Sequence, residues 1–299
     1  MTTLIGALLI GTTMGLLGSG GSAITVPILV YLVGHDAKIS IAESMAIVGI
    51  ISLVGSIPKA AAKYVDWPSV IWFGLPAMAG TYVGAWLGGR ASDALQLSVF
   101  GIIVIFAAIF MLRNAFSKSN NQPLDEQPKR PPHNFLTVTK IVTEGMTVGM
   151  ITGFVGVGGG FIIVPALMML EKLPIRTAIG TSMIIIAMKS AIGFTKYHFI
   201  LEAQGLSIDL QTIVVFSVIG LAGCAIGQKM NTKFHQATLK KIFAIFLVLI
   251  GGFVIIREGG KLLNYGNEET VSQVDGTAIP LQHRPQWRLS DSIGGDSMN

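Results

Sequence analysis

Charged residues and cysteine are both scarce in this 299-residue sequence, and each scarcity excludes a class of protein. Lys, Arg, Asp and Glu make up only 12% of the chain, whereas they make up about 25% of an average soluble domain. A soluble protein of this length needs far more charge to cover its surface, so an ordinary soluble fold is excluded. The single cysteine, Cys224, allows neither an internal disulfide nor a cysteine-based metal site.

Catalytic and nucleotide-binding motifs are missing as well. The sequence contains no HExxH zinc motif, no Walker A loop and no Cys/His spacing typical of a metal site. No Asp falls within the apolar segments, and this argues against an intramembrane aspartyl protease. We therefore expect no enzymatic activity, no cofactor and no metal. The net charge of +5 is expected to serve membrane topology and not nucleic-acid binding.

Long apolar segments dominate what the chain does contain. Hydrophobic residues make up 51% of it, and apolar runs lie near 4–33, 41–62, 69–89, 95–113, 140–170, 178–200, 210–228 and 239–257. The sequence predicts an all-α polytopic membrane protein. We divide it into a first transmembrane repeat at 1–116, a flexible polar linker at 117–138, a second repeat at 139–258 and a polar, disordered tail at 259–299.

The two halves of the chain repeat each other at an almost constant offset. GSGGSAITVP at 18–27 aligns with GVGGGFIIVP at 156–165, which is 138 residues later. At an offset of 139, Gly84 and Gly88 match Gly223 and Gly227, and the spacing of these glycines predicts close helix packing. Such an internal duplication is typical of transporters whose site lies where the repeats meet.

The first apolar segment of each half is long and is interrupted by glycines. A helix needs about 20 residues to cross the hydrocarbon core, and these segments are longer. Each is therefore predicted to be either one broken, tilted span or a re-entrant pair of half-helices. The re-entrant form collects most Lys and Arg residues on the side of the linker. We therefore expect inverted repeats with a cytoplasmic linker and both termini outside.

The glycine clusters are the strongest candidates for a binding site. Non-helical backbone at membrane depth survives only where it is buried or lines a cavity. A half-helix that starts after each cluster would direct its positive end and free N–H groups toward an anion. The residues at these breaks are Gly20, Gly21 and Ser22 in the first half and Gly158, Gly159 and Gly160 in the second. The alternative is that small residues simply let helices pack closely.

Two charged residues inside apolar segments are further candidates. Lys189 lies in the middle of its segment, where a lysine is costly and faces a cavity or a partner. It is a candidate countercharge for an anion, the alternative being a side chain that reaches the membrane interface. Glu43 is either a surface charge near a helix start or a residue for ion coupling or specificity.

Four serines inside the spans are related in pairs by the repeat. Ser44 matches Ser182, and Ser52 matches Ser190. Serine often bonds back to its own helix, but a repeated pair is also suited to donate to a bound oxyanion.

The residues around the two glycine clusters resemble the sulfite exporter TauE/SafE family. The resemblance rests on the duplicated motif Gly-x-Gly-Gly-(Gly/Ser)-(Phe/Ala)-Ile-x-Val-Pro and on Ala/Gly-x-Ser-Met about fifteen residues later. It covers about residues 4–257. The first half departs from the pattern, because Ser22 and Ala23 replace Gly-Phe and Glu43 stands where the second half has Thr181.

The resemblance implies a carrier in the bacterial inner membrane that exports a small organosulfur anion such as sulfite, sulfoacetate or a related sulfonate. We expect this anion and membrane lipid as partners, expect no nucleic acid, and leave a homo-oligomer open. Two other functions also remain open from the sequence. One is a channel or carrier for another small solute, such as a carboxylate or a metal ion, and the other is a non-catalytic membrane subunit of a complex.

Overall fold

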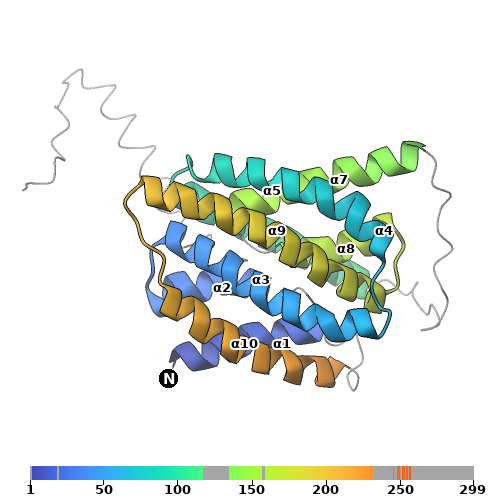
Figure 1. Cartoon of the computed structure of the whole chain (residues 1–299), viewed down its shortest axis with the longest axis horizontal. Helices are drawn as coiled ribbons and strands as arrows, with labels where there is room; N and C mark the ends of the chain where they lie inside the picture. The colour runs from blue at the N-terminus through green and yellow to red at the C-terminus, as the bar shows by residue number, and fades with distance from the viewer. Residues whose placement is uncertain are drawn as a thin grey trace, which may run out of the picture. The chain divides into compact units, whose positions relative to one another are not determined.

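The computed structural model describes residues 2–18, 20–116, 135–156 and 159–231, with isolated positions between 245 and 256. The regular elements in these residues are all helices (Figure 1). Among them, those long and apolar enough to cross a membrane are Ala37–Ala61, Trp67–Gly88, Arg176–Ala203 and Leu210–Met230. The prediction of a helical protein with several membrane spans is confirmed. Residues 117–134 of the predicted linker, most of the predicted span at 239–257 and the predicted tail lie outside the described residues.

The helices of the first half are α1 (Thr2–Leu17), α2 (Ser22–Pro27), η1 (Ile28–Val33), α3 (Ala37–Ala61), α4 (Trp67–Ser69), η2 (Val70–Gly74), α5 (Leu75–Gly88) and α6 (Asp93–Phe116). Those of the second half are α7 (Phe135–Val155), α8 (Gly160–Leu170), α9 (Ile175–Ala203) and α10 (Leu210–Asn231). η1 and η2 are π-helical turns.

Aspartates mark the starts of two of these helices. The Asp66 carboxylate accepts the backbone N–H of Ser69 at 3.0 Å and so caps α4. The Asp209 carboxylate accepts the N–H of Gln211 at 2.9 Å at the start of α10. Such side chains satisfy N–H groups that have no partner within the helix.

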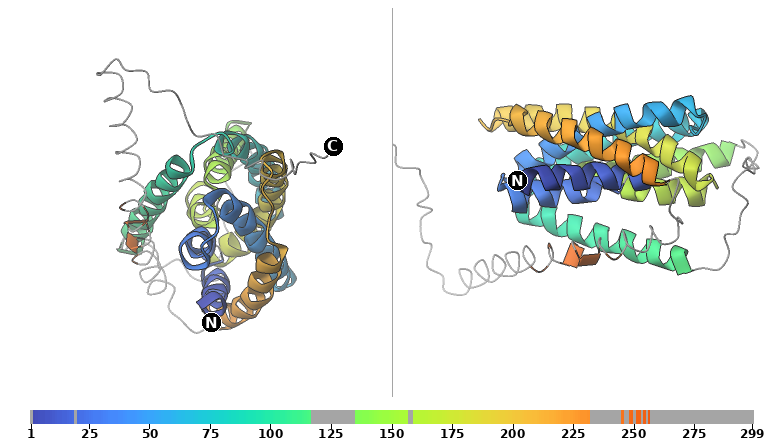
Figure 2. Two further views of the ribbon diagram at one scale, coloured as in Figure 1. Left: turned by 90° about the vertical axis from the view of Figure 1, so that its left-hand side faces the viewer. Right: turned by 90° about the horizontal axis from the view of Figure 1, so that it is seen from below.

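The main helix contacts join one half of the chain to the other. Helix α1 lies along α10, α7 lies along α5, and α3 pairs with α9 (Figures 1 and 2). The α3–α9 pair is antiparallel, because Gly55 near the end of α3 faces Met183 near the start of α9, and Gly193 faces Met45. Each half therefore supplies one helix of every major pair.

Glycines let the backbones of these pairs touch. A Cβ added at Gly84 of α5 would collide with the carbonyl oxygen of Met150 in α7, and one added at Gly223 of α10 would lie 2.7 Å from the carbonyl oxygen of Leu8. The predicted close packing at these glycines is confirmed. In a bilayer, apolar side chains are already surrounded by apolar lipid tails, so the hydrophobic effect does not drive helices together. Close van der Waals packing of small residues is therefore a main source of helix association.

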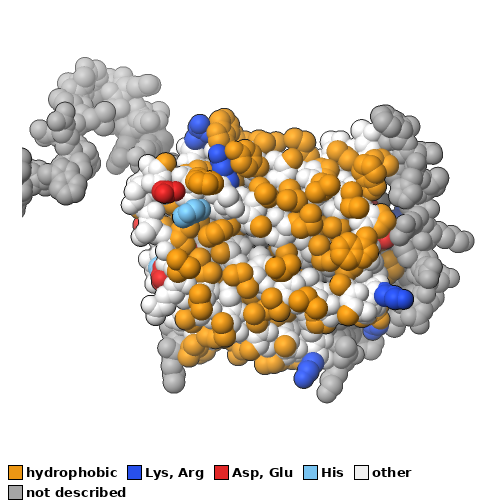
Figure 3. All heavy atoms as spheres, in the orientation of Figure 1, with side chains coloured by type: hydrophobic (Ala, Val, Ile, Leu, Met, Phe, Trp, Pro, Cys, Tyr) orange, Lys and Arg blue, Asp and Glu red, His pale blue; other side chains and the backbone are white. Residues whose placement is uncertain are grey.

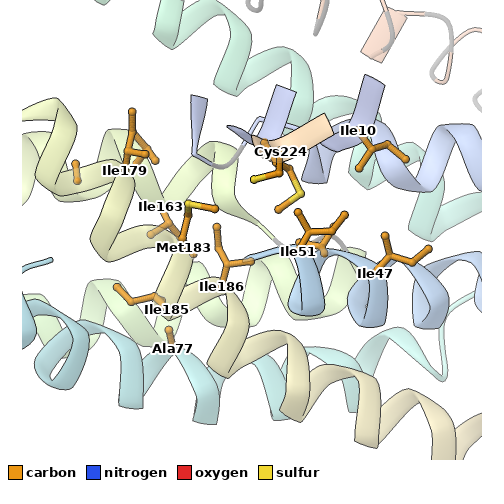
Figure 4. Close-up of a cluster of buried hydrophobic side chains, with 14 of the residues drawn as sticks. Ile10, Ile47, Ile51, Ala77, Ile163, Ile179, Met183, Ile185, Ile186 and Cys224 are labelled. Carbon is orange, nitrogen blue, oxygen red and sulfur yellow. The ribbon is translucent and has the colours of Figure 1, made fainter. Parts of the chain in front are cut away.

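A buried hydrophobic cluster fills the space between α3, α9 and α10. Ile47 and Ile51 from α3 approach Met183 and Ile186 from α9, next to Cys224 from α10 (Figure 4). The outer surface is apolar as well. On the face in Figure 3, hydrophobic side chains are spread over the whole area, and the few Lys and Arg side chains lie near its edges. That distribution suits a molecule surrounded by lipid.

Candidate functional site

The backbone changes direction at both glycine clusters. Helix α1 ends at Leu17 and α2 starts at Ser22, while α7 ends at Val155 and α8 starts at Gly160. In the first half the chain doubles back: a Cβ on Gly6 of α1 would lie 3.0 Å from Ile28 of η1, and Gly21 packs against Ile10. Helices α1 and α2–η1 therefore form an antiparallel hairpin.

Matching glycines in the two halves adopt the same left-handed conformation. Gly18 has a φ of 75° and Gly156 a φ of 72°. Glycine adopts this conformation without the steric cost that other residues meet. Gly18 packs against Ile179 of α9, and Gly156 packs against Ile41 of α3. Each break is thus held by the long central helix of the other half.

Ser44 connects one of these breaks directly to the opposite half. Its hydroxyl lies 2.9 Å from the carbonyl oxygen of Gly156 and 2.8 Å from that of Ile41 in its own helix. The Ser182 hydroxyl donates to the carbonyl oxygen of Ile179 at 2.9 Å. Both serines therefore use their hydroxyl protons on backbone carbonyls, and Ser44 in this way contacts the second break.

Lys189 is the central charged residue of the site. Its side chain is 1% exposed, and Nζ donates a hydrogen bond to the hydroxyl of Thr152 in α7. The interpretation of Lys189 as a residue that reaches the interface is wrong. No ion pair joins it to a carboxylate within the described part of the chain. An ammonium has three N–H donors, and the one described acceptor leaves two for a further partner.

The second glycine break lies beside this lysine. Gly159 has a φ of 64° and precedes α8, and a Cβ on it would lie 2.6 Å from Lys189 Nζ. The first N–H groups of a helix lack partners within the helix and carry partial positive charge. Lys189 and the start of α8 therefore place two sources of positive potential next to each other. This arrangement favours an anion.

Two polar groups hold the last turn of α7 just before this break. The carbonyl oxygen of Phe154 accepts hydrogen bonds from Gln96 Nε2 at 2.5 Å and from the Tyr197 hydroxyl at 3.1 Å. Both side chains are fully buried. They fix the position of the carbonyl end of α7 from α6 and α9.

Ser52 and Ser190 behave differently from the other repeated pair. Their hydroxyls are buried, and neither has a hydrogen-bond partner among the described residues. They belong to the central helices, where Gly49 of α3 faces Ser190 of α9. Buried hydroxyls in native proteins nearly always have partners. These two are therefore free to bond to a polar ligand in the α3–α9 interface.

Glu43 and Thr181 occupy matching positions and make matching contacts. Glu43 Oε1 accepts the backbone N–H of Asp209 at 3.1 Å, and Thr181 Oγ1 accepts the backbone N–H of Asp66 at 2.9 Å. Glu43 also pairs with His35 Nδ1 at 2.8 Å. The Glu43 side chain is fully buried, so its interpretation as a surface charge is wrong. It joins the loop before α3 to the loop before α10.

The predicted site residues fall into four places. Gly159, Gly160 and Lys189 come together at the second break, and Gly20, Gly21 and Ser22 form the first. Ser52 and Ser190 belong to the central helices α3 and α9, and Glu43 lies toward one end of α3. Gly158 lies outside the described residues. The sequence interpretation missed Thr152, although Thr152 stands where the first half has Met14, which is a change from apolar to polar.

Comparison with known proteins identifies the family of the chain. A model of the family described as sulfite exporter TauE/SafE matches residues 3–254. The chain belongs to the TauE/SafE family. A probable membrane transporter protein of Xylella fastidiosa (strain 9a5c) is 28% identical over 262 residues, which is 85% of this chain and 94% of the relative. No solved structure matches the chain.

Relatives of this TauE/SafE protein also occur in two other organisms. A probable membrane transporter protein of Bacillus subtilis is 27% identical over 259 residues, covering 82% of this chain and 93% of the relative. One from Methanocaldococcus jannaschii is 25% identical over 265 residues, covering 83% and 94%. The protein is accordingly a multi-pass membrane transporter of this family, and the relatives' names specify no substrate.

Proposed function

We propose that this TauE/SafE protein is a secondary transporter that exports a small organosulfur anion, such as sulfite, sulfoacetate or a related sulfonate, across the bacterial inner membrane. The observation that carries the proposal is Lys189, a buried cation without a described carboxylate partner beside the start of α8. A buried unpaired charge is costly, and a bound anion offsets that cost. The name of the family supports the choice of a sulfur oxyanion.

The anion binds between the two glycine breaks in this proposal. Lys189 supplies the countercharge, Thr152 orients its ammonium group, and the N–H groups at Gly158–Gly160 and Gly20–Ser22 contact the anion oxygens. Ser52 and Ser190 donate to the anion as it passes along the α3–α9 pair. Ser44 holds the second break in place, and Ser182 bonds back to its own helix. Glu43 has a role in coupling or specificity, because it connects two loops at one end of the bundle.

The paired contacts support an inverted repeat in which each half opens with a re-entrant helix. The linker at 117–138 lies in the cytoplasm, and rocking of the halves exposes the site to each side in turn. Export of an anion from a negative-inside cell gains about 2.3 kcal/mol per charge per 100 mV. The membrane potential is then a sufficient driving force.

A thermal-stability titration of the purified full-length protein tests the substrate and the lysine together. Sulfite, sulfoacetate, acetate and chloride are added in turn, because a ligand that binds only the native state stabilises it by mass action. In Lys189→Met, we expect unliganded stability to be equal or higher, since a buried charge is replaced by an apolar side chain. We expect its affinity for the sulfur anion to fall by about 10–100-fold, the value of one or two charged hydrogen bonds.

Lys140→Met is the matched control, because Lys140 pairs with Glu144 near the start of α7, and the second break follows the other end of that helix. It should bind the anion as the unchanged protein does. The proposal fails if sulfite stabilises Lys189→Met as well as it stabilises the unchanged protein. Stabilisation by acetate alone would retain the transporter and reject the sulfur substrate. Saturable, potential-dependent sulfite flux in proteoliposomes would distinguish a carrier from a channel.

A further inference from the structure

A cavity at the ends of α5 and α9 is separate from the proposed anion site. It has a volume of about 350 Å³, and its lining includes Trp86, Gly89 and Arg90 from the end of α5 and Lys196, Phe199 and Ile200 from α9. Gly89 forms the place where the two helices meet, since a Cβ on it would lie 2.6 Å from Ile200. The cavity lies at the end of two predicted membrane spans, which is where a bilayer has its interface.

Two cations beside this cavity are held by aromatic rings. Arg90 Cζ lies 3.8 Å from the centroid of the Trp86 ring. Lys196 Nζ lies 4.7 Å from the centroid of the Tyr82 ring and 3.4 Å from its hydroxyl oxygen. Cation–π contacts orient the positive groups but leave their charge intact. Neither cation forms an ion pair with a carboxylate in the described residues, and the cavity lining contains no acidic side chain.

The apolar wall of the same cavity faces outward. Phe199 is 60% exposed and Trp86 is 43% exposed, next to Ile200. Large exposed aromatic side chains at the end of a membrane span are typical of contact with lipid at the headgroup level. The cavity thus combines a positive end with an apolar side, and one small free anion would use only the positive end.

We propose that this cavity binds an anionic phospholipid. The lipid phosphate lies between Arg90 and Lys196, and one acyl chain runs along Trp86 and Phe199. Basic pockets between membrane helices bind acidic headgroups in this way, and the buried chain adds apolar contact. This site is independent of the anion site at Lys189.

The opposite end of the molecule offers a natural control. The repeat places Lys229 where the first half has Arg90, but it places Ala225 where the first half has Trp86. The second half therefore has a cation at the matching position but alanine in place of the tryptophan. Lys229→Gln removes one positive charge at a position that the proposed lipid site does not use.

Native mass spectrometry of the full-length, delipidated protein tests the proposal. Phosphatidylglycerol and phosphatidylcholine of equal chain length are added to the unchanged protein, to the double variant Arg90→Gln/Lys196→Gln and to Lys229→Gln. We expect the unchanged protein to prefer phosphatidylglycerol, the double variant to bind it at least tenfold more weakly, and Lys229→Gln to bind it normally. The charge-conserving variant Arg90→Lys/Lys196→Arg should restore most of the binding, and this separates loss of charge from loss of folding.

Three results would overturn the lipid site. The first is equal binding of the two lipids to the unchanged protein. The second is equal loss of phosphatidylglycerol in Lys229→Gln and in the double variant. The third is an inorganic phosphate or sulfite adduct that requires Arg90 and Lys196 while neither lipid does, because this would identify a free-anion site. None of these measurements depends on transport, so failure here leaves the proposed function intact.

Discussion

The two halves of the chain share one frame but carry their charges in different places. In the second half, Lys189 contacts Thr152 beside the glycine break. At the matching positions the first half has Met14 and Ile51, and both are fully buried in the hydrophobic cluster. Figure 4 shows Ile51 within that cluster. The described residues hold a buried lysine at the glycine cluster of the second half alone, so the proposed anion site is single although both halves contain a glycine cluster.

The opposite asymmetry occurs toward the ends of the central helices. The first half has the buried carboxylate of Glu43 with His35, and the second half has Thr181 and Leu173 at the matching positions. Both Glu43 and Thr181 accept the N–H of an aspartate that precedes a helix of the other half. A hydroxyl is sufficient for that contact, so the carboxylate and the histidine are additions of the first half.

Transfer of the lysine to the first half should have the largest effect on stability. Ile51 is fully buried, so Ile51→Lys should cost about 3–5 kcal/mol of unfolding free energy, as an uncompensated buried charge does. Adding Met14→Thr supplies a hydroxyl and should recover about 1 kcal/mol. Thermal unfolding in detergent measures both changes. If Ile51→Lys is as stable as the unchanged protein, the first half also accommodates a buried cation. That result would contradict the proposed difference between the two halves.

Removal of the matching acceptors at the helix ends should have a moderate effect. Glu43→Ala leaves both the Asp209 N–H and His35 without the carboxylate, and we expect a loss of about 1–3 kcal/mol. Thr181→Val removes one acceptor only and should cost about 1 kcal/mol. Chemical unfolding compares the two variants. Glu43→Gln retains an acceptor oxygen and should be less damaging than Glu43→Ala. A larger loss in Thr181→Val than in Glu43→Ala would contradict this assignment.

The smallest effect concerns the pH dependence at the start of α10. The Thr212 hydroxyl donates to Asp209 at 2.6 Å and lowers the pKa of that carboxyl below its ordinary value of 3.8. A lowered pKa contributes stability above the ordinary value, and this contribution is lost as the pH falls through the pKa of the folded state. Thr212→Val should therefore be slightly less stable than the unchanged protein at neutral pH. The difference should shrink in acid, as thermal unfolding at several pH values would show. A stability difference between the two proteins that grows in acid would contradict a lowered pKa of Asp209.

The predictable part of the structure follows from composition and spacing. Helices appear where apolar runs are long. The sequence was sufficient to single out Lys189 as a candidate site residue, because a lysine is costly anywhere in an apolar segment. The glycine pairs predicted close packing because their spacing places them on one helix face.

Contacts between distant parts of the chain could not be predicted in this way. The hydrogen bond from Ser44 to Gly156 depends on how the two halves meet, and hydropathy carries no information on that geometry. Thr152 is an ordinary hydroxyl until α9 places Lys189 next to it. Glu43 left two interpretations open because its partner Asp209 belongs to the other half.

The pairing of α1 with α10 has a consequence for biosynthesis. Helix α1 leaves the ribosome well before its packing partner α10, which is completed only when nearly all of the described chain has been made. Contacts so distant in sequence make assembly slow and expose intermediates. The glycine-rich face of α1 therefore stays in contact with the translocon or with lipid until α10 has been synthesised. A nascent chain truncated before α10 lacks the native packing partner of this face.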